Sequence, residues 1–261
     1  MLPDFELITH KFPDREDITI FPIADVHLGA KECMEEEFFG FIDAISKQPN
    51  AYVVLDGDLI NNATRNSVSN VFEERYRPAD QKRLMAKILE PVRDRILVGV
   101  PGNHEGRSGR DADDCPLYDI MCKLDIESLY RENIAFVKCM FGKTECNGLL
   151  NPTYVLAVYH GGGGGIYTGS SVNRNERFGY VLDGVDAVIS AHTHKPAITS
   201  PGKIKVDSRN NKVSVVPFKV ITATPWLSYG GYAARKQLLP SSFSLQTMTL
   251  RGRKKEIIVT M

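Results

Sequence analysis

The sequence has few of the features that mark disulfide-rich, zinc-finger or membrane proteins. Its five cysteines are odd in number and form no C-x-x-C pair, which argues against a disulfide framework and against a cysteine zinc site. No apolar run approaches the roughly 20 residues that span a bilayer. The opening segment, MLPDFELITHKFPDRED, is acidic and interrupted by prolines, unlike a signal peptide. We therefore expect a cytoplasmic protein with reduced thiols and no membrane contact.

The sequence also has no excess charge of either sign, since it contains 32 Lys and Arg and 32 Asp and Glu. This balance argues against a protein that coats a polyanion over its whole surface, although a local basic patch is compatible with it. Hydrophobic residues make up 43% and charged residues 25%, as in an ordinary globular protein. Because no repeat, low-complexity tail or linker stands out, we expect a single domain over residues 1–261.

Strand and helix patterns alternate in the first half of the chain. Buried strands that end in polar turns are predicted over 17–25, 51–60 and 94–105, and helices over 35–48 and 78–92. This order implies right-handed crossovers and a parallel sheet. The second half is strand-like with little helix, over 132–142, 152–161, 184–194, 212–225, 241–250 and 255–261. We expect a second, more antiparallel sheet there, giving an α/β fold of two packed mixed β-sheets flanked by helices.

Polar residues that can bind a metal follow five of these predicted strands. They are Asp25 and His27, then Asp58, then Asn103 with His104 and Glu105, then His160, and finally His192 and His194. Because ligands bind beyond the carboxyl ends of strands in open α/β sheets, we expect these residues to share one edge. A single histidine is most simply a hydrogen-bonded structural residue, and of the six histidines only His10 lies outside the set. Carboxylate, imidazole and amide donors without thiolate suit Mn²⁺, Fe or Zn²⁺.

The motifs D-x-H, GD, GNHE, H and A-H-x-H occur in this order between residues 25 and 194. Together they resemble the calcineurin-like metallophosphoesterase superfamily, and they depart from it only at Ala191, where glycine is more usual. The resemblance implies an α/β/β/α sandwich and two divalent metal ions, with Mn²⁺ as the first choice. It implies that one ion is bound by Asp25, His27 and His194, that the other is bound by Asn103, His160 and His192, and that Asp58 bridges them.

Two divalent ions about 3.5–4 Å apart can hold a phosphate and generate hydroxide from a bridging water, so we expect hydroxide to attack phosphorus in line. The resemblance makes His104 a catalytic histidine that is not a ligand, and that neutralises charge or protonates the leaving oxygen. Glu105 matches the acidic residue that orients such a histidine. For Glu105, a solvated loop carboxylate is the alternative.

Five consecutive glycines, Gly161 to Gly165, follow His160. We expect their bare backbone to pass close to the metals and to a bound phosphate, Gly161 above all. A mobile loop without substrate contact is the alternative, and no dinucleotide or P-loop fingerprint fits these residues. Arg65 and Arg107 follow two of the motifs and are the predicted substrate-binding side chains.

Further basic and aromatic residues lie near the motifs. The basic ones are Arg110, Arg174 and Arg177, and the segment TPWLSYGGYAARK adds Trp226, Tyr229, Tyr232, Arg235 and Lys236. Aromatic rings beside cations are able to stack on a nucleotide, but such rings more often belong to the core. The segment RGRKKE near the end reads as a turn between two strands.

The first motif, ADVHLGA, resembles that of the Mre11/SbcD-like repair exonucleases. The chain has little room for their capping and coiled-coil elements, and looks more like a compact phosphodiesterase of a kind also found in phage and prophage genomes. We predict a dinuclear metal-dependent phosphodiesterase or nuclease acting on DNA or another nucleotide phosphodiester. The alternatives are a small-molecule phosphomonoesterase or cyclic-nucleotide phosphodiesterase, and a non-catalytic scaffold of the same fold.

Overall fold

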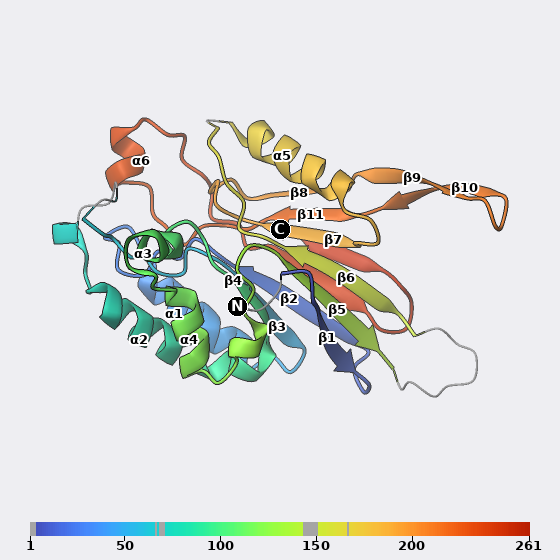
Figure 1. Cartoon of the computed structure of the whole chain (residues 1–261), viewed down its shortest axis with the longest axis horizontal. Helices are drawn as coiled ribbons and strands as arrows, with labels where there is room; N and C mark the ends of the chain where they lie inside the picture. The colour runs from blue at the N-terminus through green and yellow to red at the C-terminus, as the bar shows by residue number, and fades with distance from the viewer. Residues whose placement is uncertain (1–3, 66, 68–70, 143–150, 166) are drawn as a thin grey trace.

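Two β-sheets face each other, and helices cover both outer faces (Figure 1). The computed structural model describes residues 4–65, 67, 71–142, 151–165 and 167–261, without the side chains of Asp111 and Tyr232. The core between the sheets is built from alternate apolar residues of facing strands, among them Ile20, Val54, Val98, Leu156 and Ile189, which are all buried. The predicted arrangement of two packed mixed sheets flanked by helices is confirmed.

The five-stranded sheet contains the predicted parallel strands. Its order is β13 (Ile257–Thr260), β12 (Thr247–Arg251), β2 (Asp17–Ile23), β3 (Ala51–Asp56) and β4 (Ile96–Val100). Strands β2, β3 and β4 run parallel, whereas β12 pairs antiparallel with β2 and with β13. The outer face packs against α1 (Glu35–Ser46), α2 (Pro78–Leu89) and α4 (Pro116–Lys123), through apolar residues such as Phe38 and Met85.

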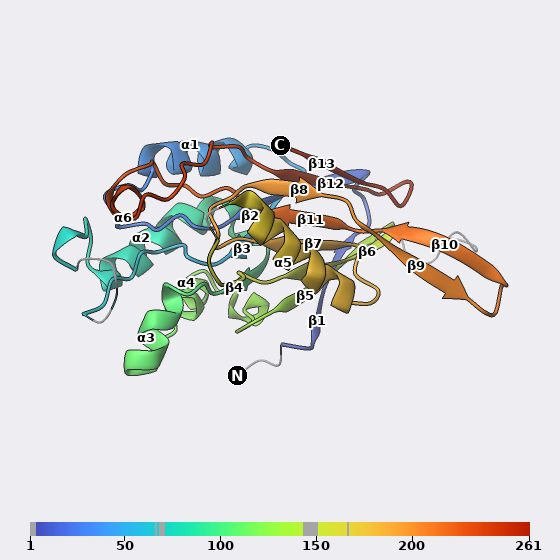
Figure 2. The same ribbon diagram turned by 90° about the horizontal axis from the view of Figure 1, so that it is seen from above.

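The six-stranded sheet lies against it. Its order is β1 (Leu7–Phe12), β5 (Ala135–Phe141), β6 (Thr153–Val158), β7 (Ala187–Ser190), β11 (Lys219–Thr222) and β8 (Ala197–Thr199). Helix α5 (Thr168–Val181) covers its outer face, as Figures 1 and 2 show. The remaining helical elements are α3 (Glu105–Ala112), α6 (Gly231–Arg235), and 3₁₀ turns over Val71–Glu73, Glu90–Arg95 and Glu127–Leu129.

The second half departs from the prediction in its strand directions. The pairs β6–β7 and β7–β11 are parallel, and so is β1–β5, so this sheet is mixed rather than mainly antiparallel. Strand β1 is not among the strands predicted from the sequence, which begin at residue 17. The predicted strand over 212–225 divides at Phe218 into β10 (Lys212–Pro217) and β11, and β10 forms a projecting hairpin with β9 (Gly202–Asp207) (Figures 1 and 2).

Helix α5 was missed because its buried face carries no apolar stripe. Its buried residues are Ser171, Asn175 and Gly179, each four positions from the next. A Cβ on Gly179 would lie 2.3 Å from the Phe218 ring, so this helix packs through small and polar residues. Hydrophobic periodicity does not detect such a helix. In the described residues, no helix combines the length and the apolar character needed to cross a membrane.

Candidate metal centre

The predicted ligands gather at the carboxyl ends of β2, β3, β4, β6 and β7. Backbone bonds beyond the strands hold these ends together: Asp25 N donates to Gly57 O over 3.0 Å, and His27 N donates to Asp58 O over 2.9 Å. On the other sheet, Ala191 N donates to His160 O over 3.0 Å. The Asp25 carboxylate joins the two sheets, because its Oδ2 accepts from His192 N over 3.0 Å.

Two neighbouring groups of donor atoms lie at this edge, and Asp58 Oδ2 lies 3.3 Å from His160 Nε2 in one and 3.9 Å from His27 Nε2 in the other. Asp25, His27 and His194 form one group, and Asp58, His160 and His192 form the other, with the donor atoms of each group within 4.8 Å of one another. Asn103 joins the second group, since its Oδ1 lies 2.6 Å from His192 Nδ1. These are the two sets that the sequence resemblance implied. His104 also forms a group with His27 and Asp58, although the resemblance gives it no metal.

Distances between the donor atoms suit shared metal ions. His194 Nε2 lies 3.3 Å from both His27 Nε2 and Asp25 Oδ1, and His160 Nε2 lies 3.3 Å from Asp58 Oδ2. Two donors bound tetrahedrally at about 2.0–2.1 Å are about 3.3–3.4 Å apart. Asp25 Oδ1 and His160 Nε2 are buried without a hydrogen-bond partner, an arrangement that proteins avoid unless something else satisfies the atoms. The residues therefore fit a pair of divalent ions.

The charges of the site favour cations. Burial acts to raise the pKa of Asp58, but His160 and His104 outweigh it, so this pKa lies well below its ordinary value. Burial acts to lower the pKa of His160, yet Asp58 and Asp25 raise it well above the ordinary value. The carboxylates thus remain charged and attract positive charge, which a divalent ion supplies by displacing imidazole protons.

Most of the ligand-bearing residues have an unusual backbone. Positive φ angles between 49° and 67° occur at five predicted ligands: Asp25, His27, Asp58, His192 and His194. Such conformations are uncommon for residues other than glycine and persist where surrounding contacts enforce them. Their concentration at one edge indicates that the fold holds these side chains in place at a cost in local strain.

Gly57 and Gly102 allow the turns after β3 and β4 to touch. A Cβ on Gly57 would lie 2.4 Å from Gly102 N, and a Cβ on Gly102 would lie 2.1 Å from Asp58 Oδ1. Gly57 also has a φ of +76°. Larger residues at either position would therefore separate Asp58 from the β4 turn that carries Asn103 and His104.

Glu105 fixes the same two turns, rather than the ring of His104. Its Oε2 accepts from Asp58 N and Gly102 N over 2.8 and 2.9 Å, and its Oε1 accepts from Leu59 N and Ile60 N over 2.8 and 3.3 Å. It is 2% exposed, so it is not a solvated loop carboxylate either. Burial, with Asp58 nearby, raises the pKa of Glu105 to about 7, and the amide donors oppose this shift.

His104 and Arg107 lie beside the two donor groups and contact each other. His104 Nδ1 lies 2.9 Å from Asn61 O, and Arg107 Nη2 lies 2.8 Å from His104 Nε2. His104 Nε2 lies 3.8 Å from Asp58 Oδ2. Burial, the largest influence, lowers the pKa of His104. His104 and Arg107 thus lie side by side next to the two donor groups.

A cavity of about 560 Å³ opens onto this centre. Among the predicted substrate-binding residues it is lined by Arg107, but neither by Arg65, which is exposed, nor by Gly161. The glycine run reaches the cavity through Gly163, Gly164 and Gly165 instead. Its carbonyls are held by Arg174 of α5, which donates to Gly162 O and, over 3.4 Å, to Gly164 O.

The aromatic segment divides between core and cavity. Trp226 is 1% exposed and packs against Phe38 and Phe243, so it belongs to the core. Tyr229 and Arg235 line the cavity. The side chain of Tyr232 lies outside the described residues.

Sequence reasoning missed two contributors to the site. Asn62 Nδ2 donates to His104 O over 2.9 Å, and Asn62 has a φ of 45°. The segment GDLINN held the signal, because asparagine is enriched in this backbone conformation. The carbonyl of Asp56 accepts from His160 Nδ1 over 2.6 Å, and no local pattern indicates such a bond.

Comparisons with known proteins show the family of the chain. No curated protein matches the chain. A solved structure, a conserved uncharacterized protein of Streptococcus pneumoniae TIGR4 described as a predicted phosphoesterase, matches with 10% identity and a TM-score of 0.37. The match covers 90% of this chain and 83% of the other. The family model of calcineurin-like phosphoesterases matches residues 18–196, which is more than half of the chain and includes every predicted ligand. The chain therefore belongs to the calcineurin-like phosphoesterase family and is a metal-dependent phosphoesterase.

Proposed function

We propose that the protein is a phosphodiesterase that hydrolyses nucleotide phosphodiesters, DNA among them, with two divalent ions. The observation that carries the proposal is the pair of neighbouring donor groups, in which Asp58 Oδ2 lies 3.3 Å from His160 Nε2 and 3.9 Å from His27 Nε2, together with buried unpartnered atoms on Asp25 and His160. These atoms, Asp25 Oδ1 and His160 Nε2, lie 3.9 Å apart.

Each ion has its own set of side chains. Asp25, His27 and His194 would hold one, Asn103, His160 and His192 would hold the other, and both would use Asp58. Two ions held in this way polarise phosphoryl oxygens and activate a water for attack on phosphorus. Nitrogen and oxygen donors without thiolate suit Mn²⁺, with Fe and Zn²⁺ as alternatives.

Arg107 and His104 would act on the substrate directly. Because His104 Nδ1 donates to Asn61 O, its Nε2 is the nitrogen available to a substrate. A phosphoryl oxygen is a stronger acceptor for Arg107 than an imidazole nitrogen, so substrate binding would draw Arg107 from His104 Nε2. Nε2 would then be free to take up a proton from solvent, and the resulting imidazolium would give that proton to the leaving oxygen.

The charges around the cavity favour a diester over a monoester. Apart from Arg107 and the side chains of the metal centre, its lining has three cationic side chains and three carboxylates, namely Lys31, Lys195, Arg235, Glu32, Glu73 and Glu74. A monoester carries up to two negative charges and calls for an excess of cations, whereas a diester carries one. The volume of about 560 Å³ is also in the range of sites that take nucleotide-sized ligands.

A substrate panel with Mn²⁺ supplied tests this proposal. We expect bis(p-nitrophenyl) phosphate and single-stranded DNA to be hydrolysed, p-nitrophenyl phosphate to react at least about tenfold more slowly, and EDTA to abolish all turnover until Mn²⁺ is restored. Faster turnover of the monoester, or preferred turnover of 2′,3′-cyclic nucleotides, would favour the small-substrate alternatives. If DNA is untouched while small diesters react, the nuclease part of the proposal is wrong. Bound metal without hydrolysis of any ester would indicate a scaffold.

A further inference from the structure

One wall of the cavity is apolar and belongs to the segment after β11. Its residues are Leu227, Tyr229, Leu238, Leu239 and Pro240, and the same cavity is lined by predicted metal ligands and by Arg107. Tyr229, Leu238 and Leu239 are 54%, 38% and 45% exposed, so much of their surface is open to a ligand. This wall is not needed to bind metals or to attack a phosphate. It is therefore available to the group that the phosphate carries.

The wall is held in place by bonds to the metal centre and to the core. Tyr229 Oη donates to Leu238 O and Lys195 Nζ donates to Leu239 O, both over 2.9 Å, and Ser241 Oγ donates to His194 O. At its base, Trp226 N donates to Asp25 O over 3.0 Å, and the Trp226 ring is buried. Because Tyr229 is tied at its hydroxyl, its ring is a fixed surface, and a ligand meets a preformed site.

We propose that this wall is a subsite for a planar aromatic group of the substrate, a nucleobase, so that the substrate is a diester with a nucleoside on one side of the phosphate. The inference rests on the proposed phosphodiesterase function and narrows it. A fixed tyrosine ring bordered by leucines offers stacking surface to any base, because every base has an aromatic face. Arg235, which also lines the cavity, precedes Leu238 by three residues and adds a cation near this wall in sequence.

Two esters with the same leaving group test the subsite. In thymidine 5′-(p-nitrophenyl phosphate) the second substituent is a nucleoside, and in methyl p-nitrophenyl phosphate it is a methyl group. With Mn²⁺ supplied, we expect kcat/KM to be at least about tenfold higher for the thymidine ester. The double variant Tyr229→Ser, Leu239→Ser should lose most of this preference while its kcat/KM for the methyl ester changes less than about twofold.

Control variants separate the subsite from folding and from the metal centre. Val213→Ser removes an exposed aliphatic side chain on the projecting hairpin and should leave the preference unchanged. Tyr229→Phe keeps the ring and should therefore retain more of the preference than Tyr229→Ser. This comparison of single variants replaces the double variant if the double variant folds poorly. The metal content of each variant is measured beside the kinetics.

The outcomes distinguish the two proposals. If neither ester is hydrolysed by the metal-loaded protein, the phosphodiesterase function is wrong, and the subsite with it. If the methyl ester is hydrolysed but the thymidine ester is no better, the function stands and the nucleobase subsite is wrong. Equal losses for both esters in the double variant would also overturn the subsite, since the wall would then act on the common part of the substrate or on the fold.

Discussion

Two histidines join the two sheets by the same kind of hydrogen bond, at opposite edges of the molecule. His160 Nδ1 lies 2.6 Å from Asp56 O at the carboxyl end of β3, and His10 Nε2 lies 2.8 Å from Leu97 O near the start of β4. The other ring nitrogen of His160 is buried without a partner and faces Asp58 at 3.3 Å. Burial is the largest influence on the pKa of His10, which is lowered. The same bond thus orients a proposed metal ligand at one edge, and at the other it orients a histidine that belongs to no metal-competent group of the described residues.

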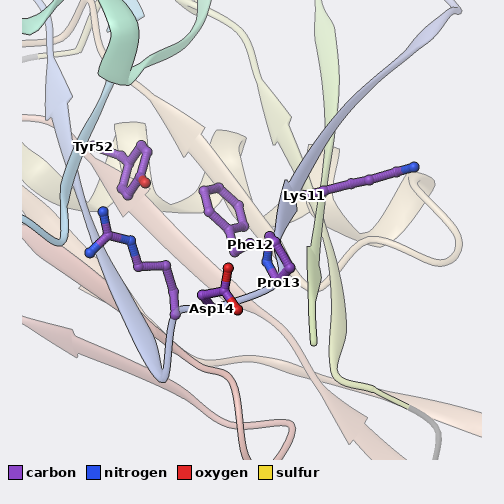
Figure 3. Close-up of a pocket in the computed structure, with 6 residues that line it drawn as sticks. Lys11, Phe12, Pro13, Asp14 and Tyr52 are labelled. Carbon is purple, nitrogen blue, oxygen red and sulfur yellow. The ribbon is translucent and has the colours of Figure 1, made fainter. Parts of the chain in front are cut away.

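The edge near His10 also has a hollow, of about 290 Å³ (Figure 3). It is lined by the end of β1, by the turn that follows and by one residue of β3, namely Lys11, Phe12, Pro13, Asp14, Arg15 and Tyr52. Across the described part of the chain, each group of metal-competent side chains lies at the other edge. The comparison shows that concavity alone does not make this site. The candidate metal site differs from the hollow in that carboxylates converge there at the ends of parallel strands.

The largest effect is expected for Asp58→Ala, because Asp58 is the predicted ligand shared by both ions, and its Oδ2 lies 3.3 Å from His160 Nε2 and 3.9 Å from His27 Nε2. We expect kcat/KM to fall by about 10³-fold or more for every substrate that the wild type hydrolyses, together with loss of bound metal. Asp14→Ala, in the hollow at the opposite edge, is the matched control and should retain wild-type activity. An Asp58→Ala protein with more than about a tenth of wild-type activity would contradict the assignment.

A smaller and more selective effect is expected for His104→Ala. If His104 protonates the leaving oxygen, its loss should lower kcat by about 10²-fold or more for a dinucleotide, whose alkoxide leaves poorly. Hydrolysis of p-nitrophenyl esters should change little, because p-nitrophenolate leaves without a proton. Metal content should equal that of the wild type. Loss of an ion would instead make His104 a ligand, as its proximity to His27 and Asp58 also allows.

Glu105→Gln tests whether the turns at the site edge depend on one carboxylate. An amide has one acceptor oxygen, so its NH₂ group would face two of the four backbone donors that Glu105 now accepts from. We expect the free energy of unfolding to fall by about 3 kcal/mol and activity to fall by about 10–100-fold. Glu37→Gln, on the exposed surface of α1, should change neither quantity. Urea unfolding of both variants is the measurement.

The smallest effect is expected at His10. Its pKa is lowered from 6.5 in the folded protein, so the unfolded state binds more protons and stability falls as the pH drops through 6.5. His10→Gln keeps an N–H donor for Leu97 O and removes the titration. Urea unfolding of metal-free protein at about pH 7 and pH 5 should show a shallower loss of stability in the variant, by at most about 1.4 kcal/mol per pH unit. Equal losses in both proteins would contradict this account of His10.

The strands that carry Asp25, Asp58 and Asn103 were predictable because their signals are local. An apolar run followed by Gly-Asp or Gly-Asn-His marks both the strand and its turn, and the parallel order follows from the crossovers. The assignment of Glu105 to the ring of His104 was wrong, because its partners are amides of a turn about 45 residues earlier in the chain. The apolar wall of the cavity and helix α5 could not be predicted from the sequence either, since both depend on which segments the fold places against them.

The central claim is that Asp58 lies between two metal ions. Crystals grown with Mn²⁺ and measured at the manganese absorption edge test it most directly, because anomalous scattering counts and places the ions. If two ions bind, we expect two anomalous peaks, one beside Asp25, His27 and His194 and one beside Asn103, His160 and His192. A single peak, or none, in crystals of active protein would contradict it.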